Sequence, residues 1–138
     1  MITVIDLNAE LAKLRMFRGR TPQSTFAERE GSAARVVPYR DGAIFTTKFA
    51  GKGTWECHPK GDELVHILDG AATLDIAHGD EPSQSFALSA GMVAVIPQGA
   101  WHRFRSVDGV TLMTATPQPS ELIQQDVDDP RKVELQSI

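Results

Sequence analysis

The sequence predicts an all-β domain, and three observations carry that prediction. Eleven glycines and eight prolines separate short apolar runs along most of the 138 residues. These runs are too short for helices, which normally need about ten residues. Turn signals lie between them, including an Asp-Gly pair at Asp108-Gly109 that is typical of hairpins. Many short, evenly spaced strands favour a sandwich or barrel over a parallel sheet with crossover helices.

The elements can be assigned in chain order. An edge strand at Thr3–Leu7 is followed by a short helix at Asn8–Leu14, with Asn8 as its cap. The remaining strands are expected at Ala34–Val37, Ala43–Phe49, Thr54–His58, Glu63–Leu68, Ala71–Ala77, Gln84–Leu88, Met92–Ile96, Trp101–Val107 and Val110–Thr116. The turns between them fall at Arg40–Gly42, Lys60–Asp62, Asp69-Gly70, His78–Asp80, Ala90-Gly91 and Asp108-Gly109.

One segment tests the all-β interpretation, because Glu63–His66 also has the Glu-x-x-His spacing of metal sites in helical bundles. The apolar run Glu63–Leu68 is six residues long, contains Val65 and Ile67, and lies between two glycines. These features favour a strand. On a strand, Glu63 and His66 point to opposite faces of the sheet.

Composition and charge exclude several classes of protein. The length fits one domain, and 41% hydrophobic with 23% charged residues excludes wholesale disorder. The single cysteine excludes an intramolecular disulfide framework. The net charge is −4 and the basic residues are scattered, so a nucleic-acid partner is not expected. No apolar stretch approaches the roughly 18 residues of a membrane span, and the first residues lack signal-peptide features. We therefore expect a cytoplasmic protein.

Acidic and histidine side chains suggest a metal site. On the strand Thr54–His58, Glu56 and His58 project to one face, and Glu63 follows on what we expect to be the hairpin partner. His102 comes far downstream, just after a Pro-Gln-Gly turn. Two carboxylates and two imidazoles aimed into one barrel would suit a divalent metal. Their convergence depends on the fold.

Two stretches of the chain resemble the paired motifs of the cupin superfamily. The first family motif, G-x5-H-x-H-x3-4-E-x6-G, is matched at His58, Glu63 and Gly70, while Glu56 stands where the family has its first histidine. The glycine that begins the motif is not matched in register, although Gly51 and Gly53 lie close to its position. The second motif, G-x5-P-x-G-x2-H-x3-N, is matched at Gly91, Pro97, Gly99 and His102, with Ser106 in place of the asparagine.

The resemblance implies a single antiparallel jelly-roll barrel, a double-stranded β-helix, at residues 41–117. Residues 1–40 would form an N-terminal extension and residues 118–138 a C-terminal tail. The implied ligand set for one divalent ion per chain is Glu56, His58, Glu63 and His102. This set of two glutamates and two histidines is a harder and more anionic ligand set than the family's usual three histidines and one glutamate. This change favours manganese, iron, zinc or nickel over copper.

The role of Glu56 stays open at this point. It could bind the metal, act as a catalytic general base beside a three-ligand ion, or bind a polar ligand in a site without metal. Two functions are also open. The chain could be a metal-dependent oxygenase, isomerase, epimerase or lyase acting on a small organic molecule. Alternatively, it could be a non-catalytic module that senses a ligand or a metal. Arg103 and Arg105 alternate away from His102, which leaves no obvious substrate-anchoring arginine on that strand.

Residues on the outer sheet face suggest a homodimer. Trp55, Leu64 and Leu68 would form an apolar patch there, and such a patch must be covered by the N-terminal arm or a second subunit. Cupins often pair through this face, so the resemblance implies a homodimer.

Overall fold

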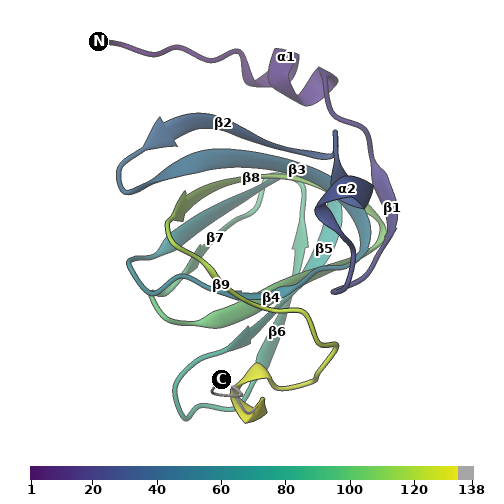
Figure 1. Ribbon diagram of the computed structural model, residues 1–138, viewed down its shortest axis with the longest axis vertical. Helices are drawn as coiled ribbons and strands as arrows, with labels where there is room; N and C mark the ends of the chain where they lie inside the picture. Colours follow the sequence, from purple (N-terminus) through teal and green to yellow (C-terminus); the bar gives the residue numbers. More distant parts are fainter. Residues whose placement is uncertain (134–138) are drawn as a thin grey trace.

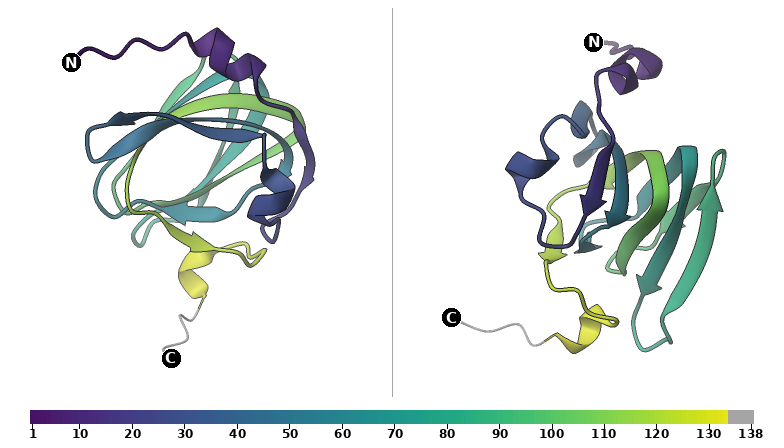
Figure 2. Two further views of the ribbon diagram at one scale, coloured as in Figure 1. Left: turned by 45° about the horizontal axis from the view of Figure 1, so that its top comes forward. Right: turned by 90° about the vertical axis from the view of Figure 1, so that its right-hand side faces the viewer.

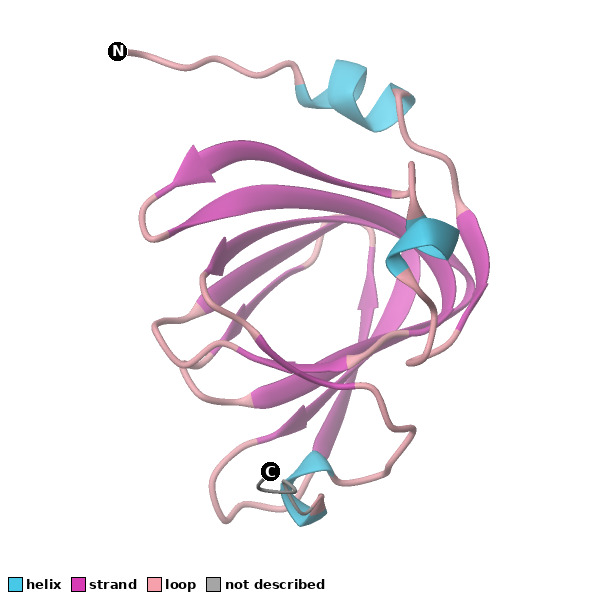
Figure 3. Cartoon of the chain, in the orientation of Figure 1, coloured by secondary structure: helices cyan, strands magenta, loops and turns pink. Residues whose placement is uncertain are grey.

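The computed structural model describes residues 1–133, and strands dominate it (Figure 3). Its elements are α1 (Leu7–Ala12), β1 (Phe17–Arg20), α2 (Phe26–Arg29), β2 (Ala33–Tyr39), β3 (Gly42–Lys52), β4 (Trp55–Cys57), β5 (Glu63–Ala77), β6 (Gln84–Ser89), β7 (Val93–Ile96), β8 (Trp101–Pro117), β9 (Glu121–Ile123) and the 3-10 helix η1 (Pro130–Lys132). The all-β prediction is confirmed.

The strands curl into a jelly roll (Figure 1). One hydrogen-bonded path runs β1-β3-β8-β4-β9, with β2 on β3, and β5 pairs with β6, β7 and β8. The path has two free ends, so hydrogen bonds do not close the barrel. The helices α1 and η1 lie at opposite ends of the molecule (Figure 2). None of the helices within residues 1–133 is long and apolar enough to cross a membrane.

Two expected turns are absent, including the hairpin expected at Asp108-Gly109, and this part of the sequence analysis was wrong. β5 runs through Asp69-Gly70 and β8 runs through Asp108-Gly109, and the two long strands pair with each other at Gly70 and Val110. The register shifts on both sides of this point. Gly70 and Gly109 both have positive φ, and a Cβ on Gly70 would collide with the carbonyl oxygen of Gly109. The glycines therefore permit an irregular, close strand contact and do not mark turns.

The N-terminal prediction also needs correction. Thr3–Leu7 pairs with no described strand, because α1 begins at Leu7. The Asp6 carboxylate accepts a hydrogen bond from the Ala9 amide and caps the helix two residues before the expected cap at Asn8. The sequence analysis also missed β1, α2 and β9. β1 pairs with β3 in parallel, and β9 pairs with β4.

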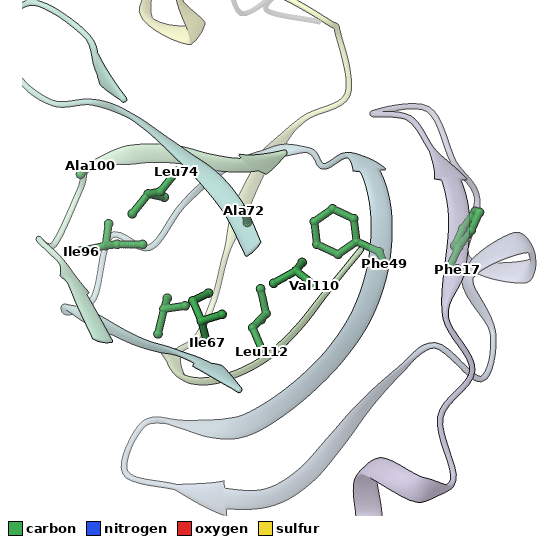
Figure 4. Packing of buried hydrophobic residues seen from close by; sticks show 10 residues of the cluster. Phe17, Phe49, Ile67, Ala72, Leu74, Ile96, Ala100, Val110 and Leu112 are labelled. Atoms are coloured by element: carbon green, nitrogen blue, oxygen red, sulfur yellow. The ribbon is translucent and has the colours of Figure 1, made fainter. Parts of the chain in front are cut away.

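Apolar side chains from the neighbouring strands β3, β5 and β8 pack together inside the jelly roll. Ile67, Leu112 and Val110 point inward together, and Phe49 packs beside them (Figure 4). Ile67 is fully buried. A fully buried side chain of this size contributes about 1.5–3 kcal/mol to stability. This core fixes the strands that carry the polar side chains described below.

The expected outer patch is broken up by the C-terminal segment. Trp55 is only 1% exposed, and its Nε1 donates a hydrogen bond to the Val127 carbonyl at 2.8 Å. The Arg103 guanidinium also stacks on its ring, 4.5 Å from the centroid. Trp55 is therefore covered within the chain and forms no patch with Leu64, which lies exposed on β5.

Candidate metal centre

Four side chains from three strand regions converge on one point at the edge of the apolar core. Glu56 lies on β4, His58 just after it, Glu63 at the start of β5 and His102 near the start of β8. One ligand atom from each lies within 4.8 Å of all the others. This cluster could hold one metal ion, as the sequence predicted for the same four residues.

The route by which the strands bring these residues together differs from the expected hairpin. β4 and β5 do not pair with each other, because each pairs with β8. Glu56 is the direct partner of His102 across the β4–β8 ladder, while Glu63 pairs with Ile96 of β7. The segment after His58 therefore links two strands that each pair with β8, and it does not close a hairpin.

Glu63 sits between the two imidazoles. Its two carboxylate oxygens lie 3.1 Å from the Nε2 atoms of His58 and His102 respectively. Burial alone would raise the pKa of Glu63, but the two imidazoles outweigh it and lower the value to about 2. Burial would lower the pKa of His102, and the Glu63 carboxylate raises it above its ordinary value. Glu63 is therefore an anion at neutral pH.

Both Nε2 atoms fit a metal ion. They are buried and, despite their proximity to Glu63, have no partner in hydrogen-bonding geometry in the part of the chain that the structure describes. His102 Nδ1 lies 3.1 Å from the Ala100 carbonyl, which can only accept, so in the neutral imidazole Nδ1 carries the proton and Nε2 keeps the lone pair that a metal ion needs. His58 Nδ1 lies 2.9 Å from the Ser120 hydroxyl. Unpartnered buried nitrogens beside two carboxylates are the donor set that a divalent ion takes.

Further polar groups hold this cluster in place. Thr116 donates a hydrogen bond of 2.6 Å to Glu63, and its hydroxyl also lies 2.6 Å from that of Thr114. Sequence analysis missed Thr116 and Ser120. Both lie outside the two motifs, and a lone hydroxyl residue carries no sequence signal of such a role. Ser106, in place of the family's asparagine, instead braces the β5–β8 irregularity through Ala71 and Gly109.

The centre opens into a cavity of about 480 Å³. Glu56 is the most accessible of the four side chains, at 35% exposure against 4% or less for the others. Its carboxylate lies 3.8 Å from His58 Nε2. Apolar side chains such as Phe45, Phe49 and Leu112 line the cavity. A site of this size and character can enclose a small organic molecule.

Arginines also line the cavity. Arg103 and Arg105 alternate away from His102, as expected, and both hydrogen-bond Asp75, although Arg103 also borders the cavity. Arg20 of β1 and Arg29 of α2 are among the residues that line the cavity. Neither was singled out from the sequence, because neither β1 nor α2 was expected.

Comparisons with known proteins identify the fold. The model of the Cupin domain family matches residues 44–114, just over half of the chain. A cupin-2 domain containing protein from Shewanella frigidimarina is 24% identical, with a TM-score of 0.59 over 83% of this chain and 95% of that one.

A protein from Neisseria meningitidis is 23% identical, with a TM-score of 0.58 over 88% of this chain and all of that one. A hydroquinone 1,2-dioxygenase from a Sphingomonas species is 17% identical, with a TM-score of 0.55 over 63% and 65% of the two chains. No curated protein sequence matches. The family match and the shared architecture agree with the motif resemblance, and the chain belongs to the Cupin domain family.

Proposed function

We propose that the chain binds one divalent metal ion through Glu56, His58, Glu63 and His102, and that ion and cavity together bind or convert a small organic molecule. The observation that carries this proposal is the pair of buried Nε2 atoms without hydrogen-bond partners, facing two carboxylates. Removing such nitrogens from water costs free energy unless something binds them. A metal ion satisfies both at once.

The chain's own residues suggest how the site would act. Glu63 is buried and anionic, and it holds the imidazoles in place. Glu56 is accessible from the cavity and can either bind the ion or accept a proton from a bound molecule. We favour the ligand role, because its oxygen already lies 3.8 Å from His58 Nε2. A bound divalent ion would supply Lewis acidity and orient the bound molecule.

Structures of similar fold support an occupied centre. One hydroquinone 1,2-dioxygenase structure contains 4-hydroxybenzoate, and another contains Cd²⁺ with 4-hydroxybenzonitrile. These proteins are 17% and 16% identical to this chain, so they show the fold and leave its substrate undetermined. If the chain performs no chemistry, the same site would let it act as a sensor of a metal or of a small ligand.

Metal titration of the EDTA-treated protein tests the proposal. Manganese, iron or zinc should raise the melting temperature with increasing concentration, because binding to the folded state stabilises it by mass action. The double change His58→Ala with His102→Ala should abolish the shift. His78→Ala is the matched control, because His78 is exposed in a turn, and it should leave the shift unchanged. A shift that survives the double change would place the metal elsewhere.

We also propose that two copies of the chain associate through the outer face of β5 and β7. Leu64 pairs with Val95, and the next pair on the same face of the sheet is His66 with Val93. Leu64, Val93 and Val95 are exposed by 38%, 55% and 61%. This continuous apolar row replaces the patch expected around Trp55, and a second copy presents the same row to it.

Sedimentation velocity tests this association. Val95→Lys should shift the protein towards the 15.1 kDa monomer, whereas Val107→Lys, at a side chain that is 94% exposed outside this row, should not. A wild-type monomer at all micromolar concentrations would contradict the proposal.

Location in the cytoplasm remains a prediction, and the single, buried, free Cys57 is compatible with a reducing compartment.

A further inference from the structure

Within residues 1–133, Arg20 is a buried cation without an anionic partner. It ends β1, is only 8% exposed, and its Nε atom has no hydrogen-bond partner among these residues. Among residues 1–133, no carboxylate lies within ion-pair distance of its guanidinium. Burying an unpaired charge is costly, so a group in this state suggests a binding partner.

The guanidinium of Arg20 borders the cavity of the metal centre. It lies over the Phe49 ring, 4.7 Å from the centroid. A Cβ on Gly53 would lie 3.7 Å from its central carbon, so the absence of a side chain at Gly53 leaves room around it. Burial first, and Arg29 second, lower the pKa of Arg20 to about 10, while Glu56 raises it. Arg20 therefore stays charged at neutral pH.

Arg29 brings a second cation to the same place. It lies half-buried on α2, lines the same cavity, and has no side-chain hydrogen bond or ion pair within residues 1–133. Two like charges near each other destabilise the empty site. With two glutamates and a divalent ion, the two arginines would leave the cavity with a net positive charge, which favours an anionic ligand.

We propose that Arg20 and Arg29 form an anion subsite that binds the carboxylate of a small organic molecule whose other end reaches the metal centre. The planar guanidinium matches a carboxylate with paired hydrogen bonds. The apolar walls at Phe45, Phe49 and Leu112 suit an apolar or aromatic body attached to that carboxylate. This inference rests on the proposed function, since it names the class of molecule that the cavity takes.

Benzoate is a suitable probe, with benzamide as its neutral counterpart of the same shape. Calorimetric titration should show that the metal-loaded protein binds benzoate more tightly than benzamide. Arg20→Met keeps an unbranched side chain over Phe49 and removes the charge. It should lower benzoate affinity about 10- to 100-fold, the usual effect of losing charge-assisted hydrogen bonds, and leave benzamide affinity unchanged.

Arg29→Gln should weaken benzoate binding in the same direction. Arg18→Gln is the matched control, because Arg18 lies exposed on the same strand and the substitution removes the same charge. It should leave benzoate affinity unchanged. Arg20→Met should also melt at the same or a higher temperature than the wild type, because it removes an unpaired buried charge. A purely structural role for Arg20 would lower the melting temperature without changing benzoate affinity.

Several outcomes would overturn the inference. These are wild-type affinity for benzoate in Arg20→Met, equal affinity of the wild type for benzoate and benzamide, or binding of inorganic phosphate as tight as that of benzoate. If Arg20→Met does not fold, Arg29→Gln decides the matter, and unchanged benzoate affinity there refutes the subsite. Metal affinity is measured on every variant. Normal metal binding with unchanged benzoate binding refutes only the anion subsite, whereas absent metal binding in the wild type refutes the proposed function.

Discussion

The metal-free protein should depend on pH through Glu63, and Glu63→Gln isolates that dependence. Glu63 is 4% exposed and touches both imidazoles of the centre at 3.1 Å. Glutamine has nearly the same shape and keeps a carbonyl oxygen that can accept the hydrogen bond from Thr116. The change therefore removes the negative charge and leaves the packing largely intact.

The magnitude follows from the pKa of Glu63, which falls from 4.5 to about 2 on folding. At about 1.4 kcal/mol per pKa unit, the ionised carboxylate contributes roughly 3 kcal/mol to stability. Because the folded pKa is depressed, this contribution is full above about pH 4.5 and is lost as the pH falls towards 2. The pKa of His102 is raised instead, so its contribution is full below pH 6.5 and is lost as the pH rises through the raised value. Between about pH 4.5 and pH 6.5, Glu63 and His102 therefore both contribute their full stabilisation.

Urea unfolding of EDTA-treated protein at three pH values measures this effect. Near pH 5.5, Glu63→Gln should be less stable than the wild type by roughly 3 kcal/mol. The difference should shrink towards pH 2, as Glu63 becomes protonated, and again at alkaline pH, as His102 loses its proton. His78→Ala, at an exposed turn position, serves as the control and should show no such difference. A wild-type-to-Gln difference that stays constant from pH 2 to alkaline pH would refute the reasoning.

Three further predictions follow from the same geometry. Glu56→Gln should lower manganese and zinc affinity at least about 10-fold, and Glu56→His should restore binding with a preference for nickel or copper. Equal affinities of wild type and Glu56→Gln would rule out the ligand role of Glu56. Ser120→Ala should weaken metal binding about 10- to 100-fold with little change in the urea midpoint, because it removes only the group that orients His58. An unchanged metal-binding isotherm would contradict this prediction. Ile67→Ala should cost about 2–5 kcal/mol in urea unfolding, because Ile67 is fully buried in the core, and a loss below about 1 kcal/mol would show that the core is misassigned.

The fold class and the four candidate ligands could be predicted from the sequence, because both depend on local signals. Strand alternation put Glu56 and His58 on one face, and the motif spacing added Glu63 and His102. Connectivity was harder to predict. An Asp-Gly pair is typical of a tight turn, but its glycine also permits an irregularity within paired strands. The pairing of Gly70 with Val110 shows that the second case applies here.

Residues that act through long-range contacts could not be predicted. Ser120 reaches His58 from 62 positions away, and Trp55 is covered by a carbonyl 72 positions away. Arg20 looked like any scattered surface arginine, because its strand is only four residues long. Such roles depend on the tertiary arrangement, which composition and periodicity do not encode.

Elemental analysis of the purified protein tests the central claim most directly. The wild-type protein should carry one divalent ion per chain, and the double change His58→Ala with His102→Ala should carry almost none while keeping its circular dichroism spectrum. Both proteins are purified in parallel and compared by metal-to-protein ratio. Equal metal content in the two proteins, or a wild-type protein that takes up no divalent metal even after loading, would contradict the assignment of this centre.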